Sequence, residues 1–225
     1  MDAIVQKPKK TTSPQTKPGR GAQREARRRD IVLSTIRSIE RVGFADTTLA
    51  TVAEIAGVAQ GSVVFHFKTK EDLLVETLKF VADEYRDTWQ RALLEASADP
   101  IEKLCAITAI DFRRDICTLG KITVWKSFWS EAKSRPMYQK ICGGRDEARE
   151  TAMRGCIAEI LTRDGDRRDA HDLAIIILSL NDGLMETMLG GPRMLKRLDA
   201  RRLAFANLEA LLPAHAEAIR AFADR

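Results

Sequence analysis

The sequence of 225 residues predicts an all-α protein with a small amino-terminal three-helix domain and a larger helical body. Three observations support this fold class. Apolar residues recur at the three-and-four spacing of helices, strand-type alternation and Asn-Gly hairpin turns are lacking, and Gly or Pro separates the apolar segments. Apolar residues make up 44% of the chain, which is enough for one helical core beside a small head.

Positive charge is concentrated at the amino end. Residues 1 to 41 hold 11 Lys or Arg against 4 Asp or Glu, whereas residues 42 to 225 hold 26 against 28. Residues 1 to 23, with three Pro and five Lys or Arg, are expected to form a flexible basic arm. Such an arm either enters a minor groove or adds only non-specific attraction to DNA.

A first helix is predicted directly after this arm, opened by Arg27, Arg28 and Arg29. Its buried face is marked by a helical spacing of apolar and small residues and is followed by a break at Gly43. The residues of this face are Ile31, Val32, Thr35, Ile36 and Ile39.

Residues 48 to 67 (TLATVAEIAGVAQGSVVFHF) have the pattern of a helix-turn-helix. Thr48 is placed to cap a short helix, and Gly57 stands where the chain reverses with a positive φ. Val58 is expected to fill the crevice between the two helices. The buried face of the first helix comprises Leu49, Val52, Ala53 and Ala56.

The second helix of this pair has the character of a recognition helix. Val63 and Phe67 are predicted to face inward, so that short polar and apolar groups suited to base edges and phosphates face outward. These outward residues are Gln60, Ser62, Val64 and His66. Two short helices around a Gly turn also occur in all-α proteins that do not bind DNA, but the basic amino end favours DNA binding.

The run from Ala56 to Leu74 (AGVAQGSVVFHFKTKEDLL) resembles the TetR family of bacterial transcriptional repressors. The spacing of Gly57, Gly61, Phe67, Lys70 and the pair Leu73/Leu74 matches without a gap. The resemblance implies base or phosphate contacts by Gln60, Gly61, Ser62 and His66, and phosphate contacts by Thr48 and Lys70. It also implies a basic arm at 1–23, a DNA-binding domain at 24–70 and an effector-binding and dimerisation domain at 71–225.

Individual positions refine these contacts. Gln60 is the candidate for reading a base, because a Gln amide can donate and accept together against adenine. Ala59 replaces a capping Ser that is common in the family, and Val64 replaces a Tyr whose hydroxyl reaches a phosphate. Val64 could instead pack on a thymine methyl group.

Beyond residue 70 the chain is predicted to be helical throughout. The fourth helix is expected from near Lys70 to about Ala96, and the next from Asp99-Pro100 to Gly120. Further helices are expected at about 121–133, 136–163, 167–189 and 198–211, with a possible split at Gly143-Gly144.

An aromatic segment marks the body as a candidate effector site. Trp125, Phe128 and Trp129 have the spacing of one helical face, which is most often part of a core. The segment and the later Asn181-Asp182-Gly183-Leu184 resemble the BetI-type branch of the family. The resemblance implies an aromatic cage for a quaternary amine, with Tyr138 nearby and with Asp182 or Glu186 as the counter-charge. Met185 stands where an aromatic is expected, which leaves a related amine or another apolar ligand open.

The penultimate helix, Leu173 to Leu189, is apolar nearly all round and is therefore expected to be buried. The resemblance implies a homodimer through the last two long helices, although the same residues could simply close the core of one chain. The residues concerned are Leu173, Ile177, Leu180, Leu184, Leu203, Ala206 and Leu208. A dimer of this kind would bind a palindromic duplex.

Other classes of function find little support. The three His and four Cys show neither metal-ligand spacing nor a catalytic arrangement, so no enzyme, metal or cofactor is expected. No apolar run has the length of a membrane span, and we expect a soluble cytoplasmic protein. A redox-responsive regulator and a helical adaptor that does not bind DNA remain alternatives. A repressor and an activator of transcription would both use the same DNA-binding domain.

Overall fold

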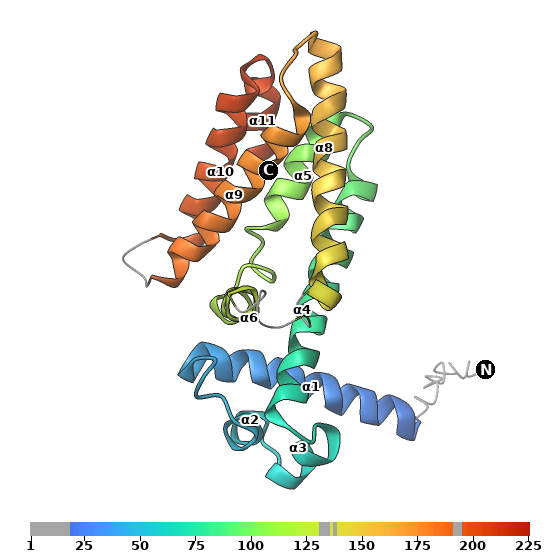
Figure 1. The fold of residues 1–225 in the computed structure, drawn as a ribbon, viewed down its shortest axis with the longest axis vertical. Coiled ribbons are helices and arrows are strands. Elements are labelled where there is room, and N and C mark those ends of the chain that lie inside the picture. Colours follow the sequence, from blue (N-terminus) through green and yellow to red (C-terminus); the bar gives the residue numbers. More distant parts are fainter. Residues whose placement is uncertain (1–18, 131–135, 137–138, 191–194) are drawn as a thin grey trace, which may run out of the picture.

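The computed structural model describes residues 19–130, 136, 139–190 and 195–225. This part of the chain is helical with no strand, which confirms the predicted fold class (Figure 1). The helices are α1 (Arg20–Val42), α2 (Leu49–Ala56), α3 (Gln60–His66), α4 (Lys70–Glu95), α5 (Pro100–Ile110), α6 (Leu119–Trp129), α8 (Gly144–Asp164), α9 (Ala170–Leu189), α10 (Arg197–Leu211) and α11 (Ala216–Ala223). A π-helix, η1 (Gln139–Gly143), precedes α8, and a 3-10 turn, η2 (Pro213–His215), precedes α11.

The amino-terminal head packs α1, α2, α3 and the first turns of α4 around one small core. The axes of α2 and α3 are bent by 112°, which is within the range of helix-turn-helix units. Gly57 between them has φ 66°, as predicted for this turn, and Thr48 caps α2 through its side chain. The head core consists of Ile31, Val32, Val52, Ala53, Val63, Phe67 and Leu73.

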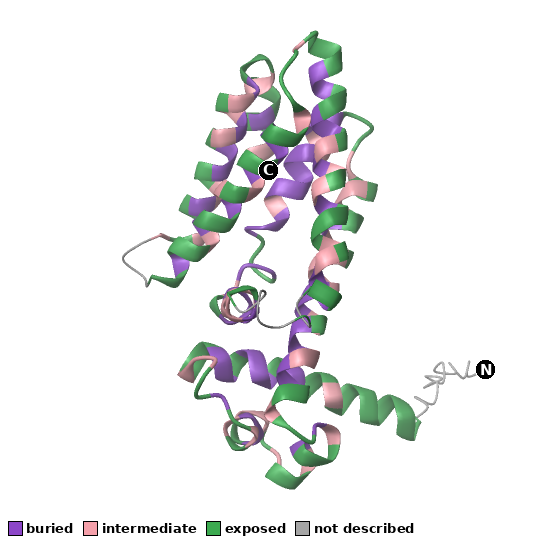
Figure 2. Cartoon of the chain, in the orientation of Figure 1, coloured by how far each residue is buried: buried purple, intermediate pink, exposed green. Residues whose placement is uncertain are grey.

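The first eleven residues of α1 project from this head. Residues 20–30, called here the α1 extension, contribute no buried residue, and only Arg28 among them is half-buried. The α1 extension points away from the rest of the head and is exposed along its length (Figures 1 and 2). Residues 20–23, predicted as part of the flexible arm, therefore belong to α1, and residues 1–18 of that arm lie outside the described residues.

The long helix α4 connects the head with the body. Its capping residue Thr69 accepts a hydrogen bond from the Asp72 amide, and its bounds agree with the prediction to within one residue. Its middle packs against α1 and α6 in a core that includes Ile39, Leu78 and Val124. The upper body is closed by α5, α8, α9, α10 and α11 around a separate apolar core (Figure 1).

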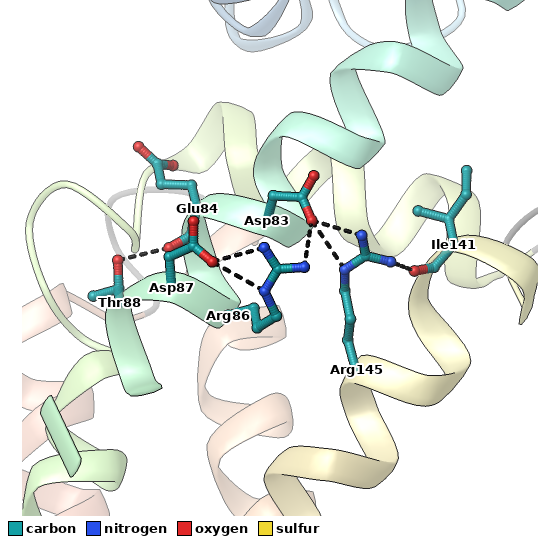
Figure 3. A network of polar contacts seen from close by, with 7 residues as sticks. All are labelled: Asp83, Glu84, Arg86, Asp87, Thr88, Ile141 and Arg145. Atoms are coloured by element: carbon teal, nitrogen blue, oxygen red, sulfur yellow. Dashed lines mark hydrogen bonds and ion pairs between the residues drawn. The ribbon is translucent and has the colours of Figure 1, made fainter. Parts of the chain in front are cut away.

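An ion-pair network ties α4 to the start of α8 (Figure 3). Asp83 Oδ1 on α4 lies 2.6 Å from Arg145 Nη2 and 2.9 Å from Arg86 Nη1. Arg145 also donates to the carbonyl oxygen of Ile141 in η1. Because Arg145 of α8 pairs with Asp83 and also binds the Ile141 carbonyl, it joins α4 to η1 and α8, whereas Arg86 pairs with Asp83 within α4.

The prediction that Gly120 ends a helix is wrong. Helix α5 ends at Ile110, and Gly120 lies in the first turn of α6, which Thr118 caps. A Cβ atom on Gly120 would lie 2.7 Å from the carbonyl oxygen of Ile36, so α6 crosses α1 at a point where only glycine fits. The sequence reading also missed α11.

The penultimate helix was predicted to be buried all round, which is wrong within one chain. Ile177 of α9 is 1% exposed, but Ile175 and Ile176 on its other side are 44% and 45% exposed.

In the described part of the chain no single helix is both long and apolar enough to span a bilayer. Only α2 and α3 pass that test as a pair, across their 112° bend.

Candidate nucleic-acid interface and effector site

Helix α3 presents most of the residues predicted to contact DNA. Gln60 and Gly61 are exposed at its start, and Val64 is 42% exposed. Ser62 and His66 are half-buried at the edges of this surface. Val63 and Phe67 are buried as predicted, at 0% and 2% exposure, so the packing of α3 fixes which side it turns outward.

Two other predicted DNA contacts have roles within the head. The Thr48 hydroxyl accepts from the Thr51 amide at 3.1 Å, and the Thr51 hydroxyl accepts from the Thr48 amide at 2.9 Å. This capping box fixes the start of α2. Lys70 Nζ donates to the carbonyl oxygen of Ala45 at 2.6 Å, which holds the start of α4 against the α1–α2 connection.

Arg28 of the α1 extension fixes the end of α3. Its Nη1 donates to the carbonyl oxygen of His66 at 3.2 Å, and its Nη2 lies 3.1 Å from Glu76 Oε2 on α4. The guanidinium also lies 4.4 Å from the centre of the Phe67 ring. The sequence reading placed Arg28 at the start of the first helix but did not identify this joint between α1, α3 and α4.

The electrostatic field at the end of α3 is positive. The pKa of His66 is lowered by desolvation and by the nearby guanidinium groups of Arg24, Arg28 and Arg27. Desolvation and the arginines that would attract a phosphate therefore both favour the neutral imidazole.

The aromatic residues of the predicted effector cage do not form one cage, because each ring has a different partner. Trp125 makes an edge contact with Tyr85 of α4, with ring centres 6.1 Å apart. Phe128 instead meets Phe44 of the head at 5.4 Å. Trp129 is 61% exposed with Lys126 Nζ 5.6 Å from its ring centre. Trp125 and Phe128 pack on the core shared by α1, α4 and α6, whereas Trp129, the last residue of α6, is not part of that core.

Two further residues of that prediction have other surroundings. Met185 is half-buried against the cluster around Phe112 and Leu184. Tyr138 lies outside the described residues.

A buried polar cluster beside Trp125 was not found from the sequence. Asp111, at the end of α5, is 0% exposed and accepts from the Tyr85 hydroxyl at 2.5 Å and from Asn181 Nδ2 at 2.7 Å. Arg149 of α8 forms an ion pair with the same carboxylate. Burial alone would lower the pKa of Arg149, but Asp111 reverses this effect and keeps the guanidinium charged. The feature of the sequence that could have indicated this cluster is Asp111, an acidic residue that directly follows the apolar residues of α5.

Two polar atoms of this buried cluster are available for a further hydrogen bond. Arg149 Nε and Asn181 Oδ1 are buried, and neither has a hydrogen-bond partner within the described parts of the chain. Asp182, the predicted counter-charge, is reached by solvent, yet desolvation by the surrounding protein raises its pKa against the opposing attraction of Arg149. Glu186, the other acidic candidate, pairs with Lys126 at 3.3 Å.

Most of the predicted dimer residues close the core of one chain. Leu173, Ile177, Leu184 and Leu208 are at most 9% exposed and have little surface left for a second chain. Leu180 is half-buried, whereas Leu203 and Ala206 of α10 are exposed.

Comparison with protein families agrees with both halves of this architecture. Residues 31–77 match the amino-terminal model of the bacterial regulatory proteins of the tetR family. Residues 100–213 match the carboxy-terminal model of BetI-type transcriptional repressors. Together the two models cover the head and most of the body.

Individual relatives show the same relationship. The chain is 33% identical over 164 residues to the HTH-type transcriptional regulator BetI of Paraburkholderia xenovorans, covering 72% of this chain and 80% of that protein. It is 31% identical over 172 residues to the Burkholderia cenocepacia regulator of the same name, covering 75% and 86%. These relatives are transcriptional regulators, not enzymes.

Solved structures share the fold. A transcriptional regulator from Saccharomonospora viridis in complex with choline has a TM-score of 0.71 at 22% identity, covering 82% of this chain and 96% of that chain. The regulator FadR of Bacillus subtilis in complex with stearoyl-CoA has a TM-score of 0.62 at 19% identity, covering 82% and 97%. The chain therefore belongs to the TetR family of transcriptional regulators, in its BetI-type branch, and its head is a DNA-binding domain.

Proposed function

We propose that the protein is a repressor that binds a palindromic operator as a homodimer in the cytoplasm and is released by a small cationic effector. The observation that carries the proposal is the outward row of α3, held by a buried head core on its other side. Gln60 reads a base from this row, because its exposed amide can donate and accept together.

The dimer forms through the exposed apolar side of α9 and α10. Ile175 and Ile176 of α9 are nearly half exposed, and Leu203 of α10 is 37% exposed with Ala206 one turn further on. A second copy related by a two-fold axis would cover these side chains and remove them from water. Such a pair would place the two α3 helices about 34 Å apart, one turn of duplex.

The effector binds between Trp125 and Asp182, with the buried cluster of Asp111 behind them. A cation would meet the Asp182 carboxylate and the faces of aromatic rings, which attract positive charge. Its polar end would satisfy the unpartnered atoms Arg149 Nε and Asn181 Oδ1. The choline bound to the Saccharomonospora regulator supports this ligand class.

Release would act through α4 and α6, which join the effector site to the head. Tyr85 and Asp83 on α4 connect the buried cluster and the α8 network to this helix, and Gly120 on α6 touches Ile36 of α1. A ligand that shifts α4 or α6 would change the separation of the two heads. Coupling of this kind is typically worth about 1–3 kcal/mol.

Selection from a pool of randomised duplexes tests DNA binding. We expect the protein to enrich a palindrome with half-sites about one helical turn apart. Gln60→Ala should lose discrimination at one base of each half-site, worth about 1–3 kcal/mol. Gln90→Ala, an exposed Gln→Ala change on α4, is the matched control and should bind as the native protein does. A monomer that enriches no sequence would disprove the proposal.

Thermal unfolding with choline and with tetramethylammonium tests the effector site. Either cation should raise the unfolding temperature and lower operator affinity in a gel-shift titration. Asp182→Asn should abolish both effects, whereas Asp172→Asn, another exposed position on α9, should retain them. An unchanged operator affinity at saturating cation would exclude that cation as the effector.

A further inference from the structure

We propose that the α1 extension is a second DNA-contact surface, which binds the phosphodiester backbone just outside the half-site read by α3. This inference rests on the proposed DNA-binding function and adds a contact that lies outside the helix-turn-helix. The contact is sequence-independent, and it lengthens the duplex that each head covers.

A groove between the α1 extension and the end of α3 forms this surface. It has a volume of about 650 Å³, and its charged and aromatic lining comprises Arg20, Arg24, Arg27, Asp30, Phe65 and His66. Three arginines against one aspartate give the groove a positive charge. A groove of this sign beside a recognition helix is complementary to a duplex, which carries about one negative charge per 1.7 Å of its axis.

The arginines of the groove form a stripe along the helix. Arg20, Arg24 and Arg27 are spaced by four and three residues, so they share one face over about 10 Å of helix length. Within the residues that the structure describes, these three side chains have no ion pair or hydrogen bond. Arg28 differs, because it donates a hydrogen bond to the His66 carbonyl oxygen and forms an ion pair with Glu76. These contacts fix the α1 extension in place.

Phe65 joins the stripe to the recognition helix. It is 71% exposed and lies four residues after Gly61, on the same face of α3. Its ring centre lies 5.6 Å from the Arg24 guanidinium, which holds that cation above the end of α3. A duplex seated on Gln60 and Gly61 would continue past Phe65, so the next phosphates on that strand would reach Arg24 and its neighbours.

The experiment compares two duplexes made from the operator obtained by selection. One duplex ends at the edges of the palindrome, and the other carries about ten further base pairs on each side, which is one helical turn. The native protein should bind the longer duplex more tightly, and the gain should persist when the flanking sequence is scrambled. The salt dependence should be steeper by about 0.9 for each added phosphate contact.

Replacing Arg20, Arg24 and Arg27 together by Gln should remove this gain and leave binding to the short duplex unchanged. The same three positions changed to Lys should retain most of the gain, because Lys still binds phosphate as a point charge. The control changes Arg91, Arg114 and Arg167 to Gln, which lowers the net charge equally at exposed positions in the body. This control should behave as the native protein.

The outcomes separate this inference from the function on which it rests. If the native protein enriches no operator, the proposed function fails. A second outcome is that the operator is bound specifically, but the flanking base pairs increase the affinity of the triple Gln variant as much as that of the native protein. In that case only the inference about the α1 extension is wrong. Equal weakening on both duplexes would also overturn it, because the arginines would then act by general attraction rather than at the flank. Because all three positions are exposed, the unfolding temperature should stay near the native value and exclude misfolding.

Discussion

The four cysteines lie inside the protein, where burial keeps their thiols protonated. Desolvation raises the pKa of Cys105 and Cys142 to about 12 and that of Cys117 to about 11, and it also raises the pKa of Cys156. Because the thiolate is the species that reacts with oxidants, these residues are poor redox sensors. The alternative of a redox-responsive regulator therefore has little physical support.

Mild oxidation should leave DNA binding unchanged. We expect operator affinity after treatment with hydrogen peroxide to equal that before it, because the thiols are both inaccessible and protonated. A thiol reagent should label the folded protein far more slowly than the protein in guanidinium chloride, where all four cysteines react. A reversible loss of affinity on oxidation would contradict this prediction.

His66 should make the stability of the head depend on pH. Its folded pKa is lowered below the unfolded value of 6.5, so the unfolded chain takes up a proton more readily. Stability is therefore unaffected well above pH 6.5 and falls as the pH drops through that value. Urea unfolding of the native protein and of His66→Gln at pH 7.5 and 5.5 measures this, and the native protein should lose more stability. If the native protein and His66→Gln lost the same stability between pH 7.5 and 5.5, groups other than His66 would cause the pH dependence.

At the scale of single elements, Gly120 is the position where the crossing of α1 and α6 is most sensitive to a small change. Gly120→Ala should destabilise the protein by about 1–3 kcal/mol, because the new methyl group meets the backbone of Ile36 rather than a flexible side chain. Gly155→Ala in α8 is the matched control, since nothing lies within 4 Å of its added Cβ. That change should stabilise by about 0.5–1 kcal/mol. Urea unfolding measures the free energy of unfolding of both variants. Equal changes in the two would contradict the close contact between Gly120 and Ile36.

The elements of the head could be predicted from the sequence because their determinants are local. The cap at Thr48, the turn at Gly57 and the helix start near Lys70 each depend on a few neighbouring residues, and the structure confirms all three. Gly120 was misjudged because its role depends on Ile36, which is distant in the sequence. A glycine that ends a helix and a glycine that admits a neighbouring helix have the same local pattern.

The site in the body shows the same limit. The spacing of Trp125, Phe128 and Trp129 suggests one face, but each ring meets a different neighbour and Trp129 is left exposed. The cluster of Tyr85, Asp111, Arg149 and Asn181 gathers residues from four helices. No periodicity within one helix could have revealed it.

At the scale of the whole molecule, the apolar surface of α9 and α10 decides whether two heads act together. Ile176→Lys places a charge in the middle of the proposed interface, where burial without a partner costs several kcal/mol. We expect a folded monomer by light scattering, with operator affinity reduced to that of a single half-site. Leu94→Lys, at an 87% exposed apolar position of α4, should remain a dimer with native affinity. A dimeric Ile176→Lys variant with native affinity would show that the two chains meet elsewhere, and the spacing of the half-sites would then have to be set by another surface.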